Sequence, residues 1–184
     1  SIVRVNQVDY GMIYRTLDGG AMGVAVPHVN TAEEAREVVR AAKFAPIGLR
    51  GSFTSRQGIG VKDYISKAND QTMVIVLLED IEAVKNLDEI LKVDHIDVFF
   101  VAPGDLAQTM GYAGAYDHPK VVETVESTLK KIVGSGRVAG TMVNDQTAEK
   151  YIKMGVRFLS VAWMPWFNAG GQGFLNKVAA AAKK

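Results

Sequence analysis

The sequence predicts an α/β protein built on a parallel β-sheet, and three observations support this. Short runs of Val, Ile and other apolar residues alternate along the 184-residue chain with amphipathic segments of helical period. These runs are apolar throughout and do not alternate with polar residues, which is typical of strands buried on both faces. Helix-length segments separate consecutive runs, as parallel strands require for their crossover connections.

Each strand is predicted from a short apolar run. The clearest runs are MVIVLL at 73–78 and DVFFVA at 97–102. A seventh run, near 47–50, is the weakest. Together the expected strands lie at 2–5, 21–27, 47–50, 73–78, 97–102, 138–142 and 158–162.

Helices are predicted between these strands from apolar residues three and four positions apart. Thr31 and Glu34 have the spacing of a capping box, which starts a helix running to about 42. Pro119 suits the first turn of a long helix that Gly134 and Gly136 end. Another helix is expected to end at 18, and others to lie at about 81–91, 147–154 and 172–182.

Two parallel architectures fit this order of elements, a (β/α)8 TIM barrel and an open doubly wound sheet. No Gly-rich phosphate-binding fingerprint follows a predicted strand, which argues against the nucleotide-binding form of the open sheet. A barrel typically needs about 250 residues, so this chain is about two βα units short. Because the sequence opens on Ser1 and already inside a strand, we expect the shortage at the N-terminus. The predicted fold is a TIM barrel lacking about its first two βα units, with residues 1–184 as a single partial-barrel domain.

Composition excludes several classes of protein. The 21 Lys and Arg residues nearly balance the 20 Asp and Glu residues, so no field of one sign is available to hold nucleic acid or an anionic membrane. Cys is absent, which removes disulfides, thiolate metal sites and Cys nucleophiles. The apolar runs are far shorter than the roughly 20 residues of a membrane span, and no signal peptide is recognised. We therefore expect a cytoplasmic enzyme or binding protein without a nucleic-acid or membrane partner.

Three charged residues follow predicted strands, at the end where parallel α/β proteins bind ligands. Arg4 ends the first strand, Glu79 directly follows MVIVLL, and Asp105 comes shortly after DVFFVA. Adjacent strands lie about 4.8 Å apart, so two carboxylates on neighbouring strands can share one cation. Oxygen ligands of this kind suit Mg²⁺ or Mn²⁺. The alternative for each acid is a place at a helix N-terminus, favoured by the helix dipole, and for Arg4 it is a salt bridge at the barrel rim.

Other polar residues give less specific signals. Asp18 closes a helix, where the dipole disfavours a carboxylate, so it needs a partner and a Lys or Arg is the expected one. His28 follows a strand and is expected at the rim beside the site rather than as a ligand. Asp80 and Asp145 have positions typical of helix caps.

The same residues match a known family. The chain resembles the HpcH/HpaI class II pyruvate aldolases, a branch of the phosphoenolpyruvate/pyruvate-binding barrel superfamily. The match runs in family order over nearly the whole chain, and the long stretch at 97–121 is quite specific. The matching segments are IVR (2–4), LDGGAMGVAVPHVNTAEEAR (17–36), FAPIGLRG (44–51), YISKANDQ (64–71), VLLEDIEAVKNLDEIL (76–91) and DVFFVAPGDLAQTMGYAGAYDHPKV (97–121).

The resemblance implies roles for five residues. Glu79 and Asp105 would be the ligands of a divalent metal, Mg²⁺, Mn²⁺ or Co²⁺. Arg4 would contact the keto or enolate oxygen of a bound 2-oxo acid, whose carboxylate would lie on the backbone N–H groups of Gly104 and Asp105. Asp18 would be the catalytic acid that pairs with a family His, expected across a subunit interface.

The implied activity is aldol cleavage of a 4-hydroxy-2-oxo acid to pyruvate and an aldehyde. Substrates of this class include 4-hydroxy-2-oxoheptanedioate and 2-keto-3-deoxy sugar acids. The metal and Arg4 would stabilise the charge of the pyruvate enolate. Family members exchange a C-terminal helix between subunits, so a dimer-based homo-oligomer, up to a hexamer, is expected. Two alternatives stay open: a citrate-lyase-like carbon–carbon lyase that uses CoA thioesters, and a truncated, non-catalytic barrel that binds a 2-oxo acid.

The sequence departs from the family pattern near the expected site. The family's catalytic His would lie before residue 1. Ala102 and Ala107 replace the usual Gly and Ser of the metal motif, and Asp80 replaces the usual Thr or Ser after the metal-binding Glu. The loop at 52–62 is shorter than usual, and the stretch AWMPWFNAGG at 162–171 is unlike other members.

Overall fold

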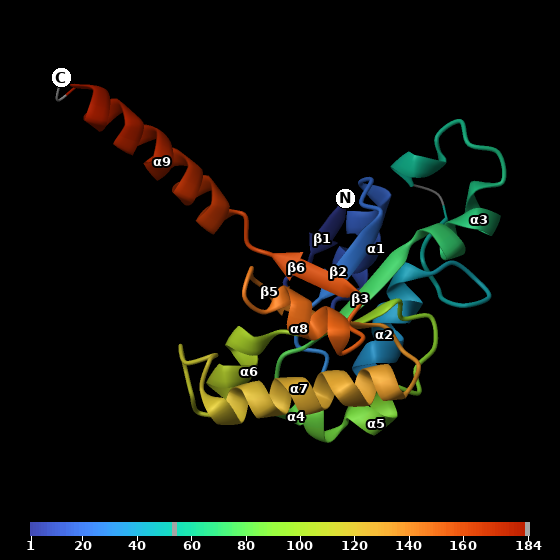
Figure 1. Ribbon diagram of the computed structural model, residues 1–184. Coiled ribbons are helices and arrows are strands. Elements are labelled where there is room, and N and C mark those ends of the chain that lie inside the picture. The colour runs from blue at the N-terminus through green and yellow to red at the C-terminus, as the bar shows by residue number, and fades with distance from the viewer. Residues whose placement is uncertain (53–54, 183–184) are drawn as a thin grey trace.

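The computed structural model describes residues 1–52 and 55–182, and a parallel β-sheet lies at its centre (Figure 1). Within these residues six strands pair in the order of the sequence. Val74 of β3 lies opposite Val24 of β2, and Val76 of β3 lies opposite Phe99 of β4. The strands are β1 (Ile2–Arg4), β2 (Gly23–Val26), β3 (Met73–Leu78), β4 (Val98–Val101), β5 (Ala139–Val143) and β6 (Phe158–Val161).

Helices connect the strands, and several begin at the predicted signals. The Thr31 hydroxyl accepts a hydrogen bond from the Glu34 N–H (3.2 Å), and the Glu34 carboxylate accepts one from the Thr31 N–H (2.9 Å). The predicted capping box therefore starts α2, and Pro119 lies in the first turn of α7. The predicted helix at 81–91 is two short helices joined at Asn86. The helices are α1 (Tyr10–Asp18), α2 (Ala32–Ala42), α3 (Tyr64–Gln71), α4 (Ile81–Lys85), α5 (Leu87–Ile90), α6 (Pro103–Thr109), α7 (Pro119–Gly134), α8 (Ala148–Lys153) and α9 (Met164–Ala182), with a 3₁₀ turn at Arg56–Gly58.

The strand predicted near 47–50 is wrong, because this segment of the described chain is a turn and irregular backbone. The Leu49 N–H donates to the carbonyl of Arg40 (2.8 Å), and the Arg50 N–H donates to the carbonyl of Lys43 (3.0 Å). Both carbonyls belong to the C-terminal end of α2 and the residue after it. The segment therefore uses its backbone groups to complete the helix end instead of joining the sheet.

Two predictions of helix ends also need correction. α9 begins at Met164 rather than near 172. Asp145 does not cap α8, whose N-cap is Thr147. Instead the Asn144 side chain accepts hydrogen bonds from the N–H groups of Gln146 and Thr147, both at 3.0 Å. In the loop predicted at 52–62, residues 53–54 lie outside the described residues.

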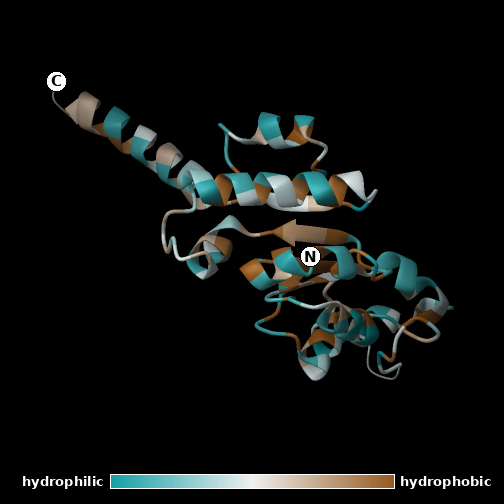
Figure 2. Cartoon of the chain, turned by 90° about the horizontal axis from the view of Figure 1, so that it is seen from below, coloured by the Kyte–Doolittle hydropathy of each residue, from teal (hydrophilic) through white to brown (hydrophobic). Residues whose placement is uncertain are grey.

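The two faces of the sheet bury different residues. Val76 and Phe99 belong to the large core between the sheet and the helices. Ile75, Leu77 and Phe100 point the other way and form a smaller buried cluster. Figure 2 shows hydrophobic strand ribbon in brown beside helices that carry many hydrophilic, teal residues. The central strands are thus buried on both faces, as their unbroken apolar sequences predict.

The sheet curls into a half-barrel of the α/β class, consistent with a truncated TIM-like barrel. In the described part of the chain, β1 and β6 form its two edges. On β1, Ile2 and Val3 are 43% and 40% exposed. α9 contains no buried residue and runs away from the sheet in both views (Figures 1 and 2). None of the described helices combines the length and apolar character needed to cross a membrane.

Candidate active site

A cavity of about 510 Å³ lies on the inner face of the half-barrel. Three of its lining residues are charged, namely Arg4, Glu79 and Asp105. These residues follow or end β1, β3 and β4, so each lies at the carboxyl end of a strand, as predicted. The remaining wall is mostly apolar and is made by Ile2, Ala25, Ile75, Leu77, Phe100, Ala102, Met142, Phe158 and Ser160.

Glu79 is the buried acid of this cavity, with only 1% of its surface exposed. Its Oε1 accepts a hydrogen bond from the backbone N–H of His28 (3.1 Å) and one from Nη2 of Arg4 (3.4 Å). Burial raises the pKa of Glu79, whereas His28 and Arg4 oppose this rise. Among the described residues, every contact to the Glu79 carboxylate falls on Oε1. The protein therefore holds one carboxylate oxygen and leaves the other for a ligand.

Asp105 lies in the first turn of α6, just after β4. Its side chain is exposed and makes no hydrogen bond or ion pair with another described residue. Gly104 is also exposed, and a side chain added there would meet nothing within 4 Å. Backbone N–H groups in the first turn of a helix lack intrahelical partners. This corner of the cavity therefore offers a carboxylate and free backbone donors together.

His28 and Asp80 form a second pair beside Glu79. The Nδ1 atom of His28 is 3.0 Å from Oδ2 of Asp80 and 3.6 Å from Oε1 of Glu79. The hydrogen bond to Asp80 raises the pKa of His28. Asp80 occupies the N-cap position of α4 but makes no cap hydrogen bond with its side chain. The sequence prediction of a helix cap was therefore right about position and wrong about the role of the side chain.

Asp18 forms a buried ion pair with Arg50, which is the kind of partner that its position predicted. Nη2 and Nε of Arg50 lie 3.0 Å and 3.3 Å from Oδ1 of Asp18. The guanidinium also lies over the ring of Phe44, 4.6 Å from its centre. Asp18 is not among the described residues that line the cavity. Sequence reasoning gave Arg50 no role, although the unfavourable place of Asp18 at a helix end called for such a cation.

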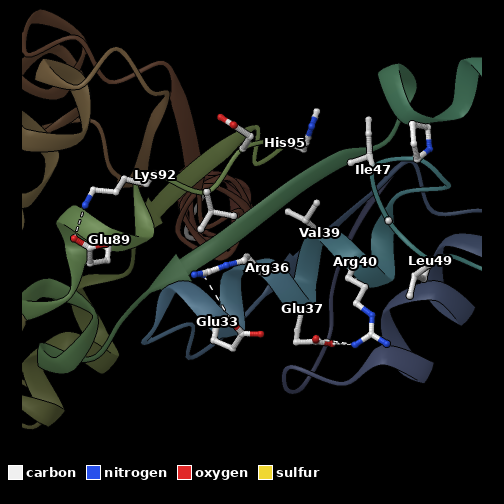
Figure 3. Close-up of a pocket in the computed structure, with 14 residues that line it drawn as sticks. Glu33, Arg36, Glu37, Val39, Arg40, Ile47, Leu49, Glu89, Lys92 and His95 are labelled. Atoms are coloured by element: carbon white, nitrogen blue, oxygen red, sulfur yellow. Dashed lines mark hydrogen bonds and ion pairs between the residues drawn. The ribbon is translucent and has the colours of Figure 1, made fainter.

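A separate hollow of about 660 Å³ lies between α2 and the segment 89–95 (Figure 3). No sequence signal pointed to it. Its charged side chains are largely paired within their own helices or turns, as the dashed lines in Figure 3 show. The pairs are Arg36–Glu33 (3.7 Å), Arg40–Glu37 (2.8 Å) and Lys92–Glu89 (2.5 Å). Such exposed pairs mark a solvated surface more than a binding site.

The sequence matches a family model described as HpcH/HpaI aldolase/citrate lyase over residues 1–163. The chain belongs to the HpcH/HpaI aldolase/citrate lyase family. Over 165 residues it is 39% identical to a 4-hydroxy-2-oxo-heptane-1,7-dioate aldolase of Escherichia coli. The same identity is found with the protein of that name from Klebsiella pneumoniae. These alignments cover 87% of this chain but only 63% and 62% of the two relatives.

Solved structures of HpcH/HpaI proteins have the same fold. A HpcH/HpaI aldolase from Desulfitobacterium hafniense is 30% identical, with a TM-score of 0.82 over 100% of this chain and 72% of that chain. A family protein from Burkholderia cenocepacia is 28% identical, with a TM-score of 0.85 over 97% of this chain and 73% of that chain. The curled sheet described above is therefore the HpcH/HpaI arrangement of strands.

HpcH/HpaI aldolases generally depend on a divalent metal. The donor chemistry of the cavity fits such an ion, because Glu79 and Asp105 both line it and provide carboxylate oxygens. Within residues 1–52 and 55–182, no three His, Asp or Glu side chains converge as a complete protein metal site. Mg²⁺ and similar ions usually keep several waters and share their sites with substrate oxygens, so two protein carboxylates are sufficient.

Proposed function

We propose that this chain is a class II, divalent-metal-dependent aldolase that cleaves a 4-hydroxy-2-oxo acid to pyruvate and an aldehyde. The observation that carries the proposal is the shared cavity of Glu79, Asp105 and Arg4 at the carboxyl ends of three parallel strands, β3, β4 and β1. The 39% identity to 4-hydroxy-2-oxo-heptane-1,7-dioate aldolases supports a substrate of that kind. We also infer that the six strands are part of a closed (β/α)8 barrel, in keeping with the solved relatives.

Glu79 and Asp105 would hold the ion, Mg²⁺, Mn²⁺ or Co²⁺. When bound, such an ion supplies a Lewis acid that stabilises negative charge on the keto oxygen as the carbon–carbon bond breaks. Arg4 adds a fixed cation whose side chain is 53% exposed at the cavity and already lies 3.4 Å from Glu79. Its planar guanidinium suits the keto or enolate oxygen of the substrate.

The substrate carboxylate would lie on the backbone N–H groups of Gly104 and Asp105. The absence of a Cβ at Gly104 leaves space for this close approach, because nothing lies within 4 Å of that position. The apolar wall around Phe100 and Phe158 would exclude water from the methylene carbon of the enolate. Asp18 enters the proposal as an acid that acts through a His partner, with Arg50 holding its carboxylate at Oδ1.

We further propose that the chain acts as a homo-oligomer through α9. The helix and the residue before it expose several large apolar side chains, namely Trp163, Trp166, Phe167, Phe174 and Leu175. Exposed apolar surface of this extent is typical of an interface between subunits. Light scattering on the whole chain and on a variant ending at 163 tests this, and a monomeric mass for the whole chain would contradict it.

Metal-dependent pyruvate release tests the proposed activity. EDTA should abolish it, and Glu79→Gln and Asp105→Asn should each reduce it by roughly 10²–10³-fold, the typical cost of removing one stabilising group. Glu123→Gln, at an exposed acid on α7, is the matched control and should leave the rate unchanged. Full metal-dependent turnover by both site variants would overturn the assignment. Faster cleavage of acyl-CoA thioesters than of free acids would favour the citrate-lyase branch that the family description includes.

A further inference from the structure

The pair formed by His28 and Asp80 has a definite place beside the proposed cation ligand. His28 follows β2, and Asp80 follows Glu79 at the end of β3. These two strands are neighbours in register, with Val26 opposite Val76, so the residues after them meet. A metal-binding role for Glu79 does not by itself require either residue.

The backbone of His28 makes the first contact with Glu79. Its φ of 54° is in the left-handed region, which costs a non-glycine residue energy but is commoner for His than for most. This conformation directs the His28 N–H to Oε1 of Glu79 at 3.1 Å. The His28 N–H and the Arg4 guanidinium thus both hold the Glu79 carboxylate at Oε1.

The imidazole makes the second contact, and Asp80 decides where the ring lies. Nδ1 of His28 is 3.0 Å from Asp80 but 3.6 Å from Glu79, so Asp80 holds the ring. Only 15% of the Asp80 side chain is exposed, and its carboxylate is not used to cap α4. Without Asp80, the ring would lose the partner that fixes it beside Oε1 of Glu79, and without the ring the Glu79 carboxylate would lose one of the contacts that orient it.

We propose that His28 and Asp80 are a positioning pair that keeps the Glu79 carboxylate oriented toward the cavity and so sets the affinity of the site for a divalent cation. The inference rests on the proposed metal-dependent function and names the residues that support its buried ligand. Neither residue needs to touch the substrate. Groups that orient a ligand in this way typically change metal affinity by 10–100-fold when removed.

Titration calorimetry with Mn²⁺ alone, on the full 184-residue chain, measures this role without any turnover. His28→Gly removes the ring but keeps the N–H and the positive φ. Asp80→Ala removes the carboxylate and loses no cap hydrogen bond. Each should weaken Mn²⁺ binding by roughly 10–100-fold. The double variant should bind no more weakly than the single variants, because the residues act as one unit.

His95→Gly is the matched control. His95 also has a left-handed backbone, with φ of 63°, and lies at the separate hollow. It should bind Mn²⁺ like the wild type. Circular dichroism on each variant tests folding, and Asp80→Ser replaces Asp80→Ala if the latter does not fold. Wild-type affinity in either the His28 or the Asp80 variant overturns the pair.

Glu79→Gln separates this inference from the proposed function. If Glu79→Gln abolishes Mn²⁺ binding while the His28 and Asp80 variants bind normally, the metal site is supported and the role of the positioning pair is refuted. If the wild type and Glu79→Gln bind Mn²⁺ equally, both the proposed function and the role of the positioning pair are refuted.

Discussion

Arg50→Met tests whether the buried ion pair with Asp18 is required for folding. The Arg50 side chain is 1% exposed and that of Asp18 5%, so the variant would leave a buried carboxylate without its guanidinium. Removing one partner of such a pair typically costs about 3–5 kcal/mol. For a chain of this length, that loss corresponds to a fall in Tm of roughly 6–20 °C. Thermal and urea unfolding followed by circular dichroism measures both quantities.

Arg40→Met provides the comparison. Arg40 also forms an ion pair, 2.8 Å from Glu37, and also lies over an aromatic ring, that of Tyr10, but half of its side chain is exposed. The Arg40→Met variant should lose far less stability than Arg50→Met, because water screens an exposed ion pair. Adding Asp18→Asn to Arg50→Met should recover part of the loss, because the amide carries no charge. An Arg50→Met loss as small as that of Arg40→Met would refute the argument from burial.

Three further outcomes are expected from unfolding measurements. Burial lowers the pKa of Lys43 from 10.5. The stability that this shift contributes is complete above pH 10.5 and is lost as the pH falls through the lowered pKa, so the Tm of the wild type relative to Lys43→Met should rise as the pH approaches 10.5 from below. A Tm difference that does not change with pH would contradict this. Gly140→Ala should lower the free energy of unfolding by about 1–3 kcal/mol, because the new Cβ would lie 2.8 Å from the Phe100 ring. An unchanged Tm would mean that the inner face of the sheet is loosely packed. Thr31→Ala should cost about 1 kcal/mol through loss of the capping box with Glu34, and Thr31→Ser should restore most of it.

The parts of the fold that could be predicted from sequence are those fixed by local patterns. The strand at 73–78 was predicted with its observed bounds, because six consecutive apolar residues are bounded by polar ones. The capping box of α2 depends on residues three apart, so spacing alone identifies it. The segment at 47–50 failed for the opposite reason: its backbone groups bind the end of α2, and nothing in its short apolar run encodes that partner.

The candidate site, too, could be predicted only where a local pattern determines it. The placement of Glu79 and Asp105 on one cavity followed from the rule that parallel strands end at the same edge. The contact of His28 with Asp80 joins residues 52 positions apart and depends on a positive φ that sequence does not reveal for a residue such as His. The partner of Asp18 was predictable as a class, Lys or Arg, but not as Arg50 in particular.

The composition of α9 determines how this segment behaves. Gly170, Gly171 and Gly173 all lie within it, and each weakens a helix by about 1 kcal/mol relative to Ala. A helix of 19 residues with no buried side chain has little else to hold it in water. Its helicity should therefore depend on whatever covers its aromatic residues. The helical circular dichroism signal of the C-terminal segment would then increase with protein concentration. Helix content in this segment would thus report on subunit association.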